Sequence, residues 1–317
     1  VYQYALDYGK IILMGAPFMI IYSALASIIR ADGSPKYSMI MLVAGAIINV
    51  ILDPIFIFTF NMGVKGGAIA TVISQIVSFI IAILYIKKIK SVKLNKNDFK
   101  LDKYVFKILS LGLSSFITQA TILILFVFMN NVLTKLGAES KFGADIPLSV
   151  YGVVSKINSL YISTILGISI GAQPIIGFNY GSGNKLRVKE TIKTVLIINF
   201  IIGIIFNIIF ILFPKQIASI FIASNDPSYQ LFIEFATLMC HTFLLLISLN
   251  ALEMTTSIVI QSLGNVLKST AVTFIRQIIL LIPISLILTF VFHKGIYGVL
   301  YAGCIADILC FIITIFI

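Results

Sequence analysis

The chain alternates long apolar segments with short polar connections over nearly its whole length. A helix that crosses a bilayer needs about 20 predominantly apolar residues, and about nine segments of the chain reach that length. The hydrophobic pattern predicts helices over 9–30, 36–60, 66–87, 105–136, 146–179, 187–213, 229–262, 267–292 and 296–317. The sequence therefore predicts an all-α polytopic membrane protein.

Composition supports this prediction and affects how the net positive charge is interpreted. Hydrophobic residues make up 59% of the 317 residues and charged residues 11%, whereas soluble domains average about 25% charged residues. A net charge of +11 would suggest a nucleic-acid partner in a soluble protein. Here the Lys and Arg residues gather in the loops between alternate helices, as the positive-inside rule requires. The basic balance is thus a topology signal, and no nucleic-acid partner is expected.

The strongest charge bias lies in the loop at 87–107. Two acidic residues, Asp98 and Asp102, face eight lysines there: Lys87, Lys88, Lys90, Lys93, Lys96, Lys100, Lys103 and Lys107. The positive-inside rule predicts that this Lys-rich loop is cytoplasmic. Alternation then places the basic connections near 30–36, 179–187 and 262–268 on the same side. A site for anionic lipid is the alternative to a plain connector between two lobes.

An internal repeat relates the first three predicted helices to the last three. Gly33 and Gly63 are 30 residues apart, and Gly264 and Gly295 are 31 apart. Three further helices precede the second copy but not the first. If the two halves are equal, about three helices are missing before Val1 and the complete protein has twelve. The expected domains are the remainder of a first lobe at 1–90 (helices 4–6), a cytoplasmic linker at 91–104 and a second lobe at 105–317 (helices 7–12).

Polar groups inside the apolar segments are the candidates for function. Asn49 and Asp53 are four residues apart and share one helix face, and a central Asp costs roughly 2.5–3.5 kcal/mol on insertion. Thr71 opens a polar stripe on the next helix. A carboxylate, an amide and a hydroxyl that converge between helices can bind a proton or Na⁺. The alternative is that these groups only hydrogen-bond neighbouring helices. Pro54 predicts a bend beside the acid.

The second lobe contains four more charges within apolar segments. Lys156 and Glu253 could pair or line a cavity, because unpaired charges at that depth are unfavourable. Arg276 is expected to extend toward the cytoplasmic side, with Asp307 as a candidate interhelical partner. His241 is interpreted as a satisfied helix-end residue rather than a proton relay.

The ordered motifs resemble those of the multidrug and toxic compound extrusion (MATE) family. The resemblance covers almost the whole chain and rests on Arg30–Gly33, Ile48–Asn49, Leu52–Pro54, Gly63–Thr71, Gly171–Pro174, Asn179–Gly181, Ile260–Gly264, Arg276–Gln277, Pro283 and Ala306–Asp307. It implies a two-lobed helical bundle, with about nine of twelve transmembrane helices present in this chain.

The resemblance also implies a function and a site. Such a protein exports organic cations in exchange for H⁺ or Na⁺ and needs no other cofactor. The cation site of the first lobe in the family looks like Asn49, Asp53 and Thr71, together with an Asp on a first helix that this chain does not contain. Some members have a second acidic pair in the second lobe. Glu253 lies near one such position, whereas Gln119 stands in place of the other acid.

Two competing functions fit the sequence less well. A flippase for lipid-linked precursors would need a strongly cationic cavity, and Lys156 with Arg276 are too few. An intramembrane transferase would need clustered Asp or His residues, whereas Asp53, Glu253 and Asp307 are dispersed. We therefore expect a monomeric, multi-pass antiporter of the plasma membrane, not an enzyme, with small organic cations and membrane lipids as its partners.

Overall fold

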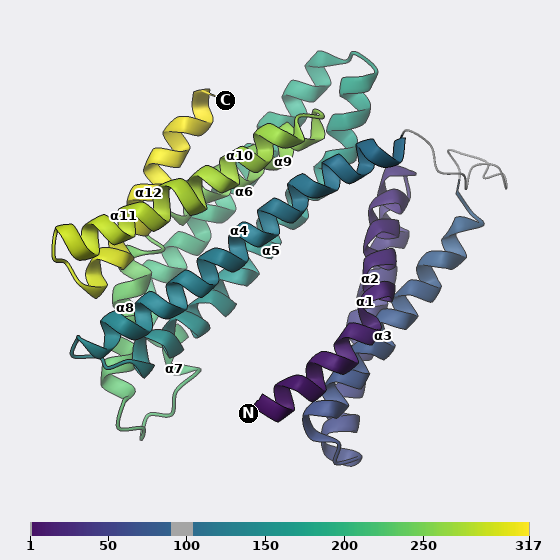
Figure 1. Cartoon of the computed structure of the whole chain (residues 1–317). Helices are drawn as coiled ribbons and strands as arrows, with labels where there is room; N and C mark the ends of the chain where they lie inside the picture. Colours follow the sequence, from purple (N-terminus) through teal and green to yellow (C-terminus); the bar gives the residue numbers. More distant parts are fainter. Residues whose placement is uncertain (1, 90–103, 317) are drawn as a thin grey trace. The chain divides into compact units, whose positions relative to one another are not determined.

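The computed structural model of the chain describes residues 2–89 and 104–316. The described residues form helices and contain no strand (Figure 1). In chain order the elements are α1 (Tyr2–Ala31), α2 (Pro35–Pro54), the π-helix η1 (Ile55–Thr59), α3 (Gly63–Ile86), α4 (Tyr104–Ala138), α5 (Asp145–Gly181), α6 (Lys185–Leu212), α7 (Pro214–Ser219), α8 (Tyr229–Thr242), α9 (Ile247–Ser262), α10 (Val266–Phe274), η3 (Ile275–Leu281), α11 (Ile282–Leu286), η4 (Ile287–Val291) and α12 (Ile296–Phe316).

These helices divide into two compact units, Val1–Lys100 and Leu101–Ile317. The first unit contains α1 to α3, and the second contains α4 to α12. The expected linker at 91–104, and all but the ends of the Lys-rich loop at 87–107, lie outside the described residues.

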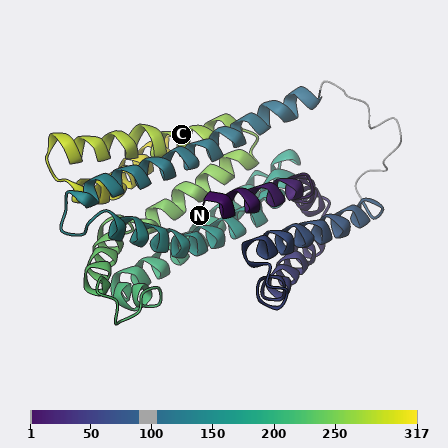
Figure 2. The ribbon, with the colours of Figure 1, turned by 60° about the horizontal axis from the view of Figure 1, so that its bottom comes forward.

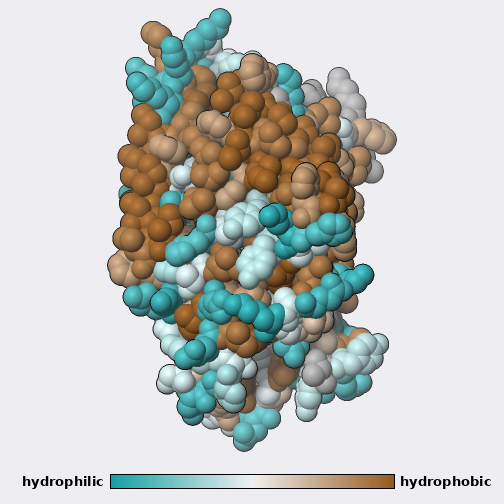
Figure 3. Space-filling view, turned by 90° about the vertical axis from the view of Figure 1, so that its left-hand side faces the viewer, coloured by the Kyte–Doolittle hydropathy of each residue, from teal (hydrophilic) through white to brown (hydrophobic). Residues whose placement is uncertain are grey.

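The predicted membrane spans are present. Among the described residues, eight helices are long and apolar enough to cross a bilayer, and α8 with α9 forms a ninth span if the bent pair is one. Hydrophobic residues cover a broad area of the face in Figure 3, as a lipid-facing surface requires. The chain is a multi-pass helical membrane protein. The pattern did not predict the short helix α7, which lies between the helices predicted over 187–213 and 229–262.

The prediction of one continuous helix over 229–262 is wrong. The chain bends by 56° between α8 and α9, although no Pro or Gly lies at the break. Side chains of neighbouring helices donate hydrogen bonds to carbonyl groups at the break. The Asn207 amide donates to Leu244 O and Leu245 O, and the Tyr161 hydroxyl donates to Ile247 O at 2.7 Å. Side chains that enter the hydrogen-bond ladder are a recognised cause of helix kinks.

Close helix packing in the first unit depends on small residues. The α1 and α3 helices lie against each other, and α2 packs on α3. A Cβ atom at Gly15 of α1 would lie 2.3 Å from Gln75 Oε1 on α3, and one at Gly45 of α2 would lie 2.0 Å from Ser78 Oγ. Small residues at helix interfaces are how membrane helices gain van der Waals contact. These contacts hold α2 and α3 close enough for their polar side chains to meet.

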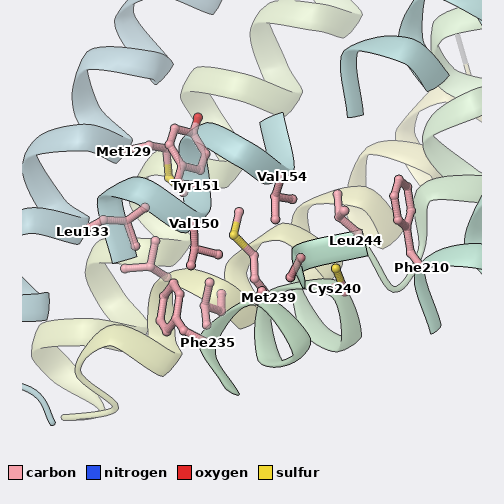
Figure 4. Packing of buried hydrophobic residues seen from close by; sticks show 14 of the residues in the cluster. Met129, Leu133, Val150, Tyr151, Val154, Phe210, Phe235, Met239, Cys240 and Leu244 are labelled. Carbon is pink, nitrogen blue, oxygen red and sulfur yellow. The ribbon is translucent and has the colours of Figure 1, made fainter. Parts of the chain in front are cut away.

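The second unit has a larger apolar core, in which α4, α5 and α8 meet (Figure 4). Met129 of α4, Val150 of α5 and Phe235 of α8 are fully buried in it. The α5, α6 and α9 helices also pack against one another (Figures 1 and 2). The α9 helix is therefore held on the side of α5 and α6, while α10 and α12 contact it as well.

The backbone carries the predicted repeat. After η1, Asn61 and Gly63 have φ values of 51° and 54°. After η4, His293 and Gly295 have values of 51° and 55°. The two pairs are 232 positions apart in the sequence. Each π-helix also closes with the same bond, because the amide nitrogen of residue 60 donates to the carbonyl of residue 55 at 3.0 Å and that of residue 292 to residue 287 at 3.1 Å. One backbone pattern is thus used in both units.

Candidate functional site

The three polar residues predicted in the first unit come together between α2 and α3. The Asn49 amide nitrogen donates to Asp53 Oδ1 at 3.3 Å and to Thr71 Oγ1 at 3.4 Å. The Thr71 hydroxyl donates to Gly67 O at 2.9 Å, so its oxygen is free to accept from Asn49. All three side chains are partly buried. The geometry therefore joins a carboxylate, an amide and a hydroxyl into one small cluster.

Two acids of this unit, Asp7 and Asp53, lie on spanning helices, and they differ in whether a cationic side chain is near. Asp7 of α1 lies 3.2 Å from Lys65 Nζ. No Lys, Arg or His within the described parts of the chain lies within ion-pair distance of Asp53. An ionised carboxylate without a counter-charge is unfavourable on a membrane helix. Asp53 is thus an acid on a spanning helix with no counter-charge among the described residues.

The backbone changes form directly after the acid. Pro54 has no N–H to complete the α-helical ladder, and the π-helix η1 begins at the next residue. The sequence predicted a bend at Pro54; the structure has a π-helical segment there, and Pro35–Thr59 continues as one span. The η1 backbone packs closely on α3, because a Cβ at Gly66 would lie 2.7 Å from both the carbonyl carbon and the carbonyl oxygen of Phe56. Single π-helical turns within α-helices occur frequently at functional sites.

The polar stripe on α3 continues away from the cluster. Ser74 Oγ donates to Thr71 O at 2.7 Å, and Ser78 Oγ donates to Met41 O at 3.4 Å. Gln75 is buried, and its Oε1 accepts no hydrogen bond from the described residues. The two serines therefore have structural roles within and between helices, while Gln75 retains an unused acceptor.

The repeat does not duplicate the cluster. Positions 232 residues after Asn49, Asp53 and Thr71 are Leu281, Ser285 and Gly303. The second unit has the matching backbone without the carboxylate or its partners. The polar cluster is thus specific to the first unit, although both units share the π-helical turn.

The second unit instead buries a network of charges from three helices. Arg276 on η3 lies between two carboxylates: its Nε is 3.2 Å from Glu253 Oε2, and an Nη is 2.6 Å from Asp307 Oδ1. The Glu253 and Asp307 side chains are only 2% and 4% exposed. With the amide of Asn250 oriented so that its oxygen faces Arg276, that oxygen also accepts from the guanidinium at 3.1 and 3.2 Å. Two carboxylates share one guanidinium, which leaves the network with one excess negative charge when both are ionised.

This network corrects two expectations and confirms a third. Asp307 is the interhelical partner of Arg276, as the sequence suggested. Arg276 does not extend out to the surface, since its side chain is 20% exposed and held by both acids. Lys156 does not pair with Glu253. It is exposed and forms no ion pair among the described residues. The sequence identified each charge but not the register that brings Glu253 to Arg276.

The remaining candidates lie apart from both clusters. Gln119 on α4 is exposed and has no hydrogen bond to Glu253 among the described residues. His241 lies in the last turn of α8, and its Nε2 lies 3.0 Å from Ile211 O, as expected for a helix-end residue. Neither extends the two polar clusters.

The fold and the site define a multi-pass helical membrane protein in which an acid on a spanning helix has no cationic partner among the described residues. The chain belongs to the MatE family, the multidrug and toxic compound extrusion family, whose model matches residues 1–55 and 115–287.

Similar proteins agree with this assignment. The multidrug export protein MepA of Staphylococcus haemolyticus is 28% identical over 317 residues, which are 99% of this chain and 67% of that protein. MepA of Staphylococcus aureus (strain bovine RF122 / ET3-1) is 30% identical over 310 residues, 96% of this chain and 64% of that protein. The chain thus spans about two thirds of these relatives. They are named as export proteins, in line with the expectation that this chain is not an enzyme.

Solved structures share the fold. A MOP superfamily transporter from Pyrococcus furiosus, with a binding pocket described as of reverse polarity, has a TM-score of 0.90 at 26% identity. The comparison covers 98% of this chain and 68% of that one. An outward-facing multidrug resistance MATE family transporter has a TM-score of 0.86 at 26% identity, over 99% of this chain and 68% of that one. The predicted helical bundle of MATE type is therefore confirmed.

Proposed function

We propose that this chain acts in a secondary antiporter that exports organic cations in exchange for H⁺ or Na⁺. The observation that carries the proposal is the cluster of Asn49, Asp53 and Thr71, with an acid that has no cationic partner among the described residues. The names of the relatives, multidrug export proteins, supply the class of substrate.

The orientation of the Asn49 amide suggests how the site changes state. As it stands, the amide nitrogen donates to Asp53, which suits an ionised carboxylate. A bound Na⁺ would be coordinated by the amide oxygen, and a protonated carboxyl would donate to it. Na⁺ therefore favours a turned amide, and a proton does so when it is held on the Asp53 oxygen that faces Asn49. Because Asn49 also bonds Thr71, that turn would alter the contact between α2 and α3.

Coupling requires that the ion and the organic cation favour different states of the transporter. A ligand that binds two states equally tightly shifts nothing. We propose that occupation of Asp53 changes the π-helical segment η1 and lowers the affinity for the exported cation. Release of the ion on the opposite side resets the site, and two lobes alternate in their access to the two sides.

The proposal includes the setting of the protein. We place it in the plasma membrane as a monomer in contact with lipid, with the Lys-rich loop at 87–107 on the cytoplasmic side. The first unit would correspond to helices 4–6, and the second to helices 7–12, of a twelve-helix transporter. A cysteine-labelling experiment at Ser91, with a reagent that does not cross membranes, tests the orientation: protection in intact cells and labelling after lysis are expected.

Transport in proteoliposomes tests the function. The full-length protein carrying this chain is reconstituted, and export of a cationic dye is driven separately by a pH gradient and by a Na⁺ gradient. We expect Asp53→Asn to abolish the response to the coupling gradient. The gradient that drives the wild type identifies the ion.

Asp7→Asn provides the matched control, because it makes the same chemical change at an acid that is already paired with Lys65. We expect it to retain gradient-driven export. Wild-type export by Asp53→Asn would contradict the proposed coupling role, and the absence of gradient-driven export in the wild type would contradict the antiporter itself.

A further inference from the structure

An open groove lies at the beginning of α6, in the second unit. Its volume is about 700 Å³, within the range of sites that hold small ligands. Apolar side chains of α6, among them Val188, Ile192 and Leu196, line it together with Leu263 beyond the end of α9. Tyr180, near the end of α5, stands at its edge. The groove thus has an apolar floor supplied by α6 and by the residue that follows α9.

A row of lysines borders this floor. Lys185, Lys189 and Lys193 all line the groove, and their spacing of four residues places them along one side of α6. At about 1.5 Å per residue the row extends roughly 12 Å along the helix axis. All three are exposed, and none forms an ion pair or side-chain hydrogen bond within the described residues. Within the described parts of the chain, no acidic residue lines the groove.

The lysine row lies where a membrane helix begins. The spanning helix starts at Lys185, so Lys193 is about two turns inside it. A lysine there can extend its ammonium group toward the headgroups while its carbon chain covers apolar surface. Beyond it, Ile197 and Ile201 remain 48% and 50% exposed. The apolar floor therefore continues directly into surface suited to an acyl chain.

We propose that the α6 groove binds an anionic phospholipid of the surrounding membrane. The lipid phosphate would lie against Lys185, Lys189 and Lys193, and an acyl chain would follow Ile192 and Ile197. Free inorganic phosphate would use only the lysines and would leave the apolar floor exposed. A zwitterionic lipid would fill the floor but would add a cationic group beside three ammonium groups. An anionic lipid satisfies both parts of the groove.

The absence of Trp from the chain makes a local test possible. A single Trp introduced by Ile197→Trp would be the sole indole of these 317 residues and would report from the groove. Ile205→Trp, two turns further along α6, provides the control, because Ile205 is 49% exposed against 48% for Ile197 and does not line the groove. Each variant is reconstituted in phosphatidylcholine with small amounts of dibrominated phosphatidylglycerol or dibrominated phosphatidylcholine, and Trp quenching is measured.

We expect brominated phosphatidylglycerol to quench Trp at position 197 with a preference of roughly fivefold or more, since one lysine near an anionic lipid surface contributes about that factor. Trp at position 205 should show almost none. Changing all three lysines to Gln should remove the preference at 197 while leaving quenching at 205 unchanged, which also shows that the helix remains in the membrane. Equal quenching by the two lipids at 197, or a preference that survives the loss of the lysines, would overturn the proposal. Transport is not measured, so the result is independent of the antiporter proposal.

Discussion

Removal of Arg276 should destabilise the second unit strongly. The guanidinium is 20% exposed and lies between Glu253 and Asp307, which are 2% and 4% exposed. Without it, two buried carboxylates would lack a counter-charge. Breaking a buried ion pair by removal of one partner typically costs about 3–5 kcal/mol. We expect Arg276→Gln to lower the free energy of unfolding by about that amount, reduced somewhat if one acid takes up a proton.

Unfolding in mixed micelles with increasing denaturing detergent, followed by circular dichroism, measures this loss. Lys141→Gln is the control, since its ion pair with Glu234 joins two side chains that are about half exposed, and such pairs contribute little. Replacement of both acids by their amides in the Arg276→Gln background should recover much of the lost stability. A loss below about 1 kcal/mol for Arg276→Gln, or no recovery in the triple variant, would refute the reasoning.

Three further predictions concern the site and the helix break. Gly66→Ala should reduce both stability and transport, because its Cβ would lie 2.7 Å from backbone atoms of Phe56. Gly67→Ala should be tolerated, since the nearest neighbour of its Cβ is a side-chain atom at 3.5 Å. Thermal unfolding and dye export measure the two effects, and equal behaviour of the two variants would contradict the close packing of η1. Asn207→Leu should lower the free energy of unfolding by about 1–3 kcal/mol, because it removes the amide that donates to Leu244 O and Leu245 O at the break between α8 and α9. An unchanged unfolding curve would count against this account of the bend. Asp53→Asn should unfold at the same temperature as the wild type or higher, because it removes an unpaired charge from a membrane helix; a marked loss of stability would indicate a structural role instead.

The polar cluster could be predicted because its geometry is mostly local. Asn49 and Asp53 share a helix face through their spacing of four residues, and Thr71 lies on the next helix, which a short connection places alongside. The membrane spans were predictable for a similar reason, since each is a long apolar segment that must satisfy its own backbone.

The features that sequence reasoning missed depend on contacts between residues far apart in the chain. The break between α8 and α9 has no Pro or Gly to mark it, and its carbonyls are bonded by Asn207 and Tyr161 from other helices. The position of Glu253 beside Arg276 depends on the register of packed helices, which apolar periodicity does not specify. In the sequence, the lysine row of α6 indicates only topology. The groove beside it also depends on Leu263 and Tyr180, which come from other parts of the chain.

The most direct test of the proposed coupling is the release of ions on substrate binding. A lipophilic cation such as tetraphenylphosphonium is added to the full-length purified protein in weakly buffered solution, and released H⁺ and Na⁺ are followed with ion-selective electrodes. If Asp53 holds the exchanged ion, the wild type and Asp7→Asn should release about one ion per bound cation. Asp53→Asn should bind the cation and release none. Undiminished ion release by Asp53→Asn would show that the exchanged ion is held elsewhere.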